Sequence, residues 1–128
     1  ERIIAPALED GKIVICDRFT DSTRMYQGMR GPSLRNLVEL LNEKIIKWDP
    51  DLTIIIDINP ETSLKRAKSR KTVEERFEDF GVELQMKMRQ GFIELAKEFS
   101  NRIEVVNGQQ SVDKLAHDIC TLVKARLS

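Results

Sequence analysis

An acidic and a basic residue stand side by side at the end of an apolar run, Asp17 and Arg18. A carboxylate in such a place can hold Mg²⁺ through water, and a guanidinium can bind a phosphate with two parallel hydrogen bonds. An ion pair that caps the end of a strand explains the same two residues at least as well. The dipeptide alone therefore leaves a nucleotide site and a structural ion pair open.

The ten residues that follow, 19–28, gather many kinds of polar group in one short stretch. They carry hydroxyl, amide, aromatic and cationic side chains: Phe19, Thr20, Asp21, Ser22, Thr23, Arg24, Met25, Tyr26, Gln27 and Gly28. Such a mixture can read the polar edge of a base, stack on a sugar or a ring, and bind a phosphate. Together with the preceding acid–base pair, it favours a nucleotide site.

Two further stretches are rich in polar groups. The first holds six basic residues, Lys65, Arg66, Lys68, Arg70, Lys71 and Arg76. Most runs of charge are solvated helix faces, and that interpretation stays open. The second stretch, residues 107–111, follows an apolar run, and Ser111 is typical of a helix cap with Asp113 in the first helical turn.

Hydrophobic periodicity predicts the elements that must position these groups. Three apolar, β-branched runs predict strands, and such continuous runs are typical of parallel sheets covered on both faces: 12–17, 52–58 and 102–107. Helical spacing predicts five helices: 1–8, 34–48, 60–69, 83–99 and 112–127. Strands that alternate with helices predict an α/β doubly wound fold. Ligands bind beyond the carboxyl ends of such strands, so we expect the site at 17–31, 65–76 and 107–111.

Composition limits the class of protein. The chain has 128 residues, of which 41% are apolar and 33% charged, as in a folded domain. Its formal net charge of zero gives no long-range attraction for nucleic acid or an anionic membrane. No apolar run approaches the roughly 20 residues of a membrane span. Cys16 and Cys120 show no metal-binding spacing, so we expect two reduced, buried cysteines in a cytosolic protein.

Residues 17–28 resemble the DRY…S…AYQG signature of bacterial thymidylate kinases, and residues 29–31 are similar to the tail that follows it. Residues 6–12 resemble the family's helix end before this strand, and residues 50–53 its PDLT entry into the next strand. The chain thus resembles the C-terminal three-fifths of that family. The resemblance implies a P-loop nucleoside monophosphate kinase-like parallel sheet with helices on both faces, truncated at the N-terminus, and one domain over 1–128.

The resemblance also implies a function, ATP-dependent phosphorylation of dTMP to dTDP by a cytoplasmic homodimer, with ATP and Mg²⁺ as cofactors. The catalytic residues it implies are Arg18, Arg70 and Arg76, the last two in a LID at about 66–80. The dTMP-binding residues it implies are Arg18, Ser22, Thr23, Tyr26 and Gln27. The ATP-binding residues it implies are Arg66, Asn107 and Gln109, and Asp17 is implied at Mg²⁺. Arg89 is similar to an arginine after the LID, where we expect a packing and ion-pair role.

One part of the family's pattern is missing from the sequence. The motif GxxxxGK[ST], whose amides cradle phosphates, does not occur, so we expect this chain alone to be inactive. Another P-loop kinase for a (deoxy)nucleoside or nucleotide, or a non-enzymatic nucleotide-binding piece, remains an alternative. Because the family's P-loop strand lies between the equivalents of 12–17 and 52–58, we expect these two strands to pair directly or to be bridged by a second chain. Without nucleotide we expect residues 69–80 to be poorly ordered.

Overall fold

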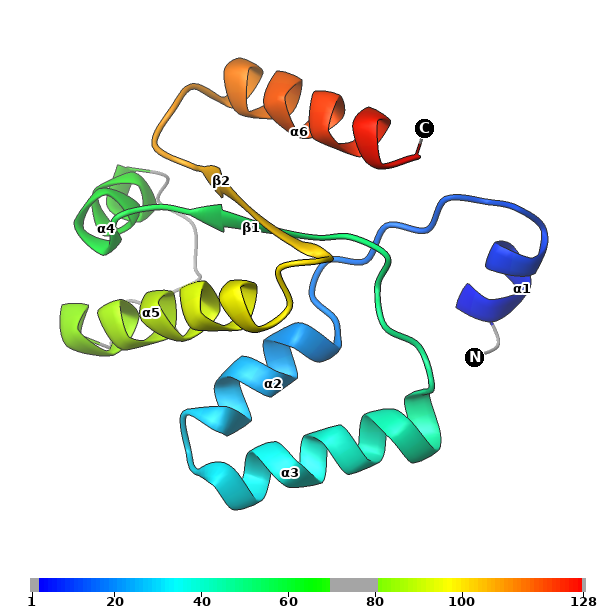
Figure 1. Cartoon of the computed structure of the whole chain (residues 1–128). Helices are drawn as coiled ribbons and strands as arrows, with labels where there is room; N and C mark the ends of the chain where they lie inside the picture. The colour runs from blue at the N-terminus through cyan, green and yellow to red at the C-terminus, as the bar shows by residue number, and fades with distance from the viewer. Residues whose placement is uncertain (1–2, 70–80, 128) are drawn as a thin grey trace. The chain divides into compact units, whose positions relative to one another are not determined.

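The computed structural model describes residues 3–69 and 81–127. The chain forms two compact units, Glu1–Asp49 and Pro50–Ser128. In its described residues, the first unit holds three α-helices and a π-helical turn: α1 (Ile4–Glu9), α2 (Thr20–Gly28), α3 (Pro32–Leu41) and η1 (Asn42–Ile46). The described part of the second holds two strands and three helices, labelled in Figure 1: β1 (Thr53–Asp57), α4 (Pro60–Ser69), α5 (Val82–Glu98), β2 (Ile103–Asn107) and α6 (Val112–Leu127).

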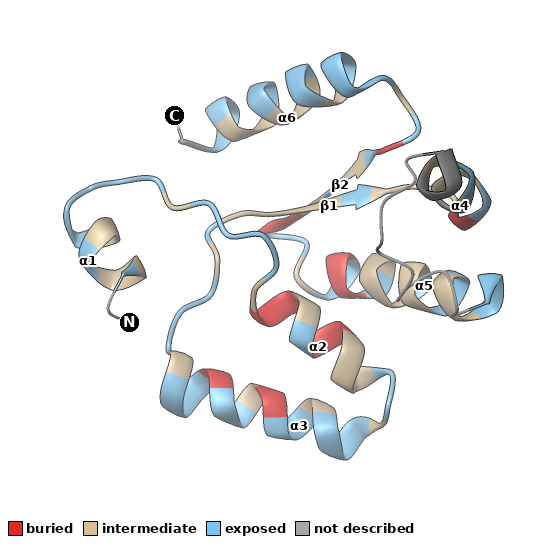
Figure 2. Cartoon of the chain, turned by 180° about the vertical axis from the view of Figure 1, so that it is seen from behind, coloured by how far each residue is buried: buried red, intermediate tan, exposed pale blue. Residues whose placement is uncertain are grey.

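In the first unit, α2 packs against α3. Gly31 lies just before α3 with φ 142°, a conformation open to glycine, and Pro32 begins the helix with its φ already fixed. The helix runs into η1, and Lys47, which follows η1, lies in the left-handed region with φ 60°. The buried residues of the pair, red in Figure 2, lie mostly on α2: Thr20, Asp21, Arg24, Met25, Val38 and Asn42.

In the second unit, β1 and β2 are parallel, with Thr53 opposite Ile103 and Asp57 opposite Asn107. Helices α5 and α6 cover opposite sides of the strand pair (Figure 1). Both strands end on a polar residue at the same edge, as the sequence predicts. The parallel pairing and the flanking helices confirm the α/β class.

The predicted strand at 12–17 is not formed. Residues 12–16 have no regular structure, and Ile13 and Ile15 are 69% and 91% exposed. A strand needs a hydrogen-bonded neighbour, and among the described residues β1 pairs only with β2. The strand predicted at 12–17 is therefore wrong, whereas bridging of this run to 52–58 by a second chain stays a prediction.

Both cysteines are free and exposed, so the prediction that they are buried is wrong. Cys16 lies in the irregular stretch and has no sheet around it, and Cys120 lies on an exposed position of α6. The other predicted strands and helices are confirmed within a few residues, except that the helix expected at 34–48 is α3 followed by η1. Helix α2 is a structural feature that periodicity did not predict. No helix in the described ranges is long and apolar enough to cross a membrane.

Candidate functional site

A pocket of about 510 Å³ lies in the first unit. It is lined by Arg18, Phe19, Thr20, Ser22, Thr23, Tyr26, Gln27 and Ile46. All five residues that the sequence suggested for a dTMP site are in this set. The structure therefore gathers residues chosen from a linear motif into one concave surface.

Helix α2 explains how the motif makes a pocket wall. Positions 22, 23, 26 and 27 share one face of a helix, because its repeat is 3.6 residues. On the other side of the helix, residues 21, 24 and 25 are buried. One short helix thus presents polar groups to the pocket and anchors itself through its other side.

Arg18 reaches the pocket from an unusual backbone conformation. Its φ is 65°, in the left-handed region, which costs a residue with a side chain about 1–2 kcal/mol. Such strain gathers at functional sites, where the surrounding structure maintains it. Asp17 is exposed beside Arg18 and is not among the residues that line the pocket.

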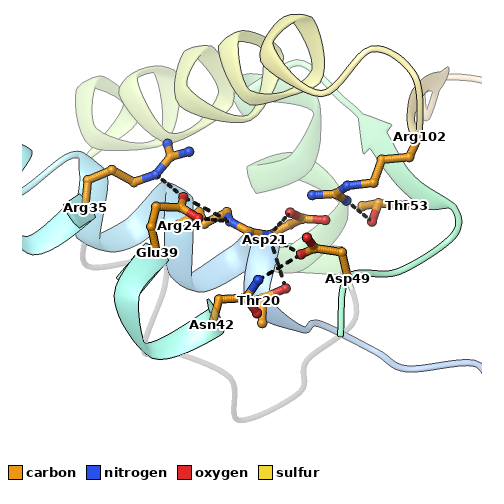
Figure 3. Close-up of polar contacts among 9 residues, drawn as sticks. All are labelled: Thr20, Asp21, Arg24, Arg35, Glu39, Asn42, Asp49, Thr53 and Arg102. Carbon is orange, nitrogen blue, oxygen red and sulfur yellow. Dashed lines mark hydrogen bonds and ion pairs between the residues drawn. The ribbon is translucent and has the colours of Figure 1, made fainter. Parts of the chain in front are cut away.

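Arg24 forms the densest polar network in the first unit (Figure 3). Its side chain is 2% exposed. Its Nη1 donates to Asp21 Oδ1 at 3.0 Å and to Asp49 Oδ1 at 2.9 Å, and its Nε donates to both carboxylate oxygens of Glu39 at 3.1 Å. Burial alone lowers the pKa of Arg24, but the hydrogen bonds that it donates to Asp49 and Asp21 outweigh this effect, so the pKa of Arg24 is raised above its ordinary value. Arg24 is therefore a permanent cation inside an acidic cage.

In the second unit, Arg66 of α4 holds the loop that follows β2. Its guanidinium donates to the carbonyl oxygens of Gly108 at 2.9 Å and Gln109 at 3.1 Å. Asn107 Oδ1 accepts from the Gln109 N–H at 2.8 Å, which shapes the turn. The three residues implied at ATP are thus brought together by the fold, with Asn107 and Gln109 exposed.

Arg89 of α5 pairs with Asp57 at the end of β1. Arg89 Nε and Nη2 donate to the two carboxylate oxygens at 2.6 and 2.7 Å. These hydrogen bonds lower the pKa of Asp57 and raise that of Arg89. The ion-pair role expected for Arg89 is confirmed, and it fixes the carboxyl end of β1 against α5.

Two further predictions from the sequence concern the LID and the metal. Arg70 and Arg76 lie outside the described residues, and so do residues 70–80 of the stretch 69–80 that was expected to be poorly ordered. Ser69 is the last residue of α4. No group of three or more metal-ligating side chains occurs in ranges 3–69 and 81–127. The single exposed carboxylate of Asp17 suits a Mg²⁺ ion that arrives with a nucleotide and keeps most of its waters, rather than an ion held by the protein alone.

Parallel strands between helices, with polar groups at their carboxyl ends, define an α/β protein of the kind that binds ligands at that edge of its sheet. The chain belongs to the thymidylate kinase family, whose sequence model, described as thymidylate kinase, matches residues 1–119. It is 51% identical over its whole length to a thymidylate kinase of Ruegeria pomeroyi, covering 61% of that protein. It is also 46% identical over its whole length to a thymidylate kinase of Jannaschia sp., of which it covers 62%. To a thymidylate kinase of Clostridium novyi it is 37% identical over 97% of its length, and it covers 61% of that protein. The chain thus spans about three-fifths of these curated relatives.

Several residues of the site escaped the sequence analysis. Phe19 and Thr20 lie inside the recognised motif, but Ile46 is nearly twenty residues away and joins the pocket only through the fold. The acids around Arg24 come from three places in the chain. The spacing of Asp21 and Arg24, three apart on a helix, is the one local signal of that network.

Proposed function

We propose that the full-length gene product transfers a phosphoryl group from ATP to dTMP, giving dTDP and ADP. The observation that carries the proposal is the pocket itself. Arg18, Ser22, Thr23, Tyr26 and Gln27, implied by the family motif, all line it in a chain half identical to a thymidylate kinase.

In this proposal, the pocket holds dTMP by complementary chemistry. The guanidinium of Arg18 binds the phosphate with charge-assisted hydrogen bonds. Hydroxyl and amide groups of Ser22, Thr23 and Gln27 bond to the nucleoside, and the ring of Tyr26 lies against the deoxyribose. Catalysis is then positioning and charge stabilisation rather than acid–base chemistry.

The ATP side of the proposal uses the second unit and the LID. Arg66 shapes the loop at Asn107 and Gln109, whose backbone and side chains are available to a base. Arg70 and Arg76 neutralise charge on the transferred group. Mg²⁺, placed with the help of Asp17 and the nucleotide phosphates, supplies further charge neutralisation when bound. We place the reaction in the cytoplasm, and residues 1–128 within one catalytic domain.

We propose a homodimer as well, supported by an apolar stripe along α3 and η1. Exposed apolar side chains recur every three or four residues: Leu34, Leu37, Leu41, Ile45 and Trp48. The first three share one face of α3. Ile45 lies in the π-helical turn and Trp48 just after it, so the apolar pattern continues past the end of the α-helix. Leu37→Glu should convert the dimer into monomers in light scattering. Val112→Glu, which charges an exposed apolar position on α6, should leave the dimer intact.

An ADP-release assay on the full-length protein tests the function. We expect turnover with dTMP in the usual range of about 1–100 s⁻¹, and weaker turnover with deoxynucleosides and other monophosphates. Arg18→Ala should lower kcat/KM for dTMP roughly ten- to a hundredfold, the effect of losing a charge-assisted hydrogen bond. Preference for a different acceptor would favour the alternative of another P-loop kinase. The 128-residue chain alone should show no turnover, since it has no phosphate-binding loop.

A further inference from the structure

We propose that Arg24 is a positioning residue that fixes the distance between the two walls of the substrate pocket. The inference rests on the proposed function of that pocket. One wall is the polar face of α2 with the residues just before it. The other is Ile46, the lining residue that comes from outside residues 18–27.

The second wall has an unusual backbone. Ile46 is the last residue of the π-helical turn η1, and such turns are often found at functional sites. The turn closes when the N–H of Lys47 donates to the carbonyl oxygen of Asn42 at 2.7 Å. The Asn42 amide then donates to Asp49 Oδ1 at 3.1 Å, so Asp49 is tied to the start of the turn.

Arg24 joins this turn to α2. The same Oδ1 of Asp49 accepts from Arg24 Nη1 at 2.9 Å, and Arg24 also bonds to Asp21 of its own helix and to Glu39 of α3 (Figure 3). A guanidinium has five donors in a rigid plane and can hold several acceptors at fixed angles, which an ammonium group cannot. Arg24 therefore locks three segments of chain together.

Arg24 acts through other residues and does not touch the ligand. It is buried, and it is not one of the residues that line the pocket. Loosening its bond to Asp49 leaves α2 anchored to α3 through Glu39 but frees the turn that carries Ile46. The consequence is a pocket of less defined width, which binds dTMP more weakly and leaves ATP binding unchanged.

Asp49→Ala tests this more cleanly than Arg24→Met, because Asp49 is half-exposed and its loss leaves no buried charge without a partner. In the full-length protein we expect KM for dTMP to rise about tenfold, with KM for ATP changed less than twofold. Asp49→Asn keeps an oxygen acceptor and should show a smaller rise. The matched control is Glu43→Ala, an exposed acid of the same turn that pairs with its neighbour Lys44. It should leave both KM values unchanged.

Hydrogen exchange of the peptide covering 42–49 supplies a readout independent of turnover. Asp49→Ala should speed its exchange, and Glu43→Ala should not. Equal effects of the two variants, an unchanged KM for dTMP in Asp49→Ala, or equal rises in both KM values would overturn the inference. A wild-type protein that does not turn over dTMP would instead refute the proposed function, and exchange at 42–49 would still decide whether Asp49 holds the turn.

Discussion

Replacing Arg24 by methionine should destabilise the protein far more than an ordinary loss of a salt bridge. The side chain of Arg24 is 2% exposed and that of Asp21 is 6% exposed, whereas Glu39 and Asp49 are 40% and 46% exposed. The latter two can recover solvation from water, so the main cost is the loss of the cation that Arg24 supplies to the buried Asp21 carboxylate. Breaking a buried pair in this way costs about 3–5 kcal/mol. That is a large part of the 5–15 kcal/mol that typically stabilises a domain.

Urea unfolding followed by circular dichroism measures this loss in the full-length protein. Arg35→Met is the matched control, because the side chain of Arg35 is 22% exposed and its ion pair, at 2.7 Å, is with the half-exposed Glu39. It should cost no more than about 1 kcal/mol, as partly exposed pairs do. If Arg24→Met lowers the free energy of unfolding by no more than Arg35→Met, the reasoning about a buried charge is refuted.

Three further substitutions should each change the stability of the fold in a definite direction. Hydrogen bonds from Arg89 hold the pKa of Asp57 below its ordinary value. This pair therefore stabilises the fold above about pH 4, and the stabilisation is lost as the pH falls through the lowered pKa of Asp57 in the folded protein. Asp57→Asn should make the urea midpoint of unfolding less sensitive to acid. Lys47→Gly removes the strain of a left-handed backbone and should raise the free energy of unfolding by about 0.5–1 kcal/mol in thermal unfolding. A lower stability of the variant would show that the Lys47 side chain contributes more than the strain costs. Gly108→Ala places a Cβ 2.7 Å from Ile56 Cγ2 and 3.0 Å from the backbone oxygen of Asp57, so it should lower the free energy of unfolding by about 1–3 kcal/mol in the same assay. An unchanged stability would mean that the loop shifts to make room for the methyl group.

The elements that could be predicted from sequence are those whose signals are local. Helix α6 and strand β2 follow from the spacing of their apolar residues, and Pro60 marks the start of α4. The run at 12–17 carries an equally strong β signal and yet forms no strand. An apolar run shows that a segment can be covered on both sides, but a strand also requires a neighbour with free hydrogen-bonding groups.

The residues of the site likewise fall into those with a local sequence signal and those without one. The polar face of α2 could be predicted because its residues are contiguous in the motif. Ile46 and Asp49 could not, since their contribution depends on a π-helical turn that alters the helix register by one residue. The cage around Arg24 likewise combines acids 15 and 25 residues away, and no local pattern marks such pairs.

The claim that the pocket at residues 18–27 is the dTMP site is tested most directly by a crystal structure of the full-length protein with dTMP. We expect the phosphate oxygens about 2.7–2.9 Å from the Arg18 guanidinium, as in charge-assisted hydrogen bonds. The nucleoside should lie against Thr23, Tyr26 and Gln27. Density for dTMP at another place, with this pocket filled by solvent, would contradict the account.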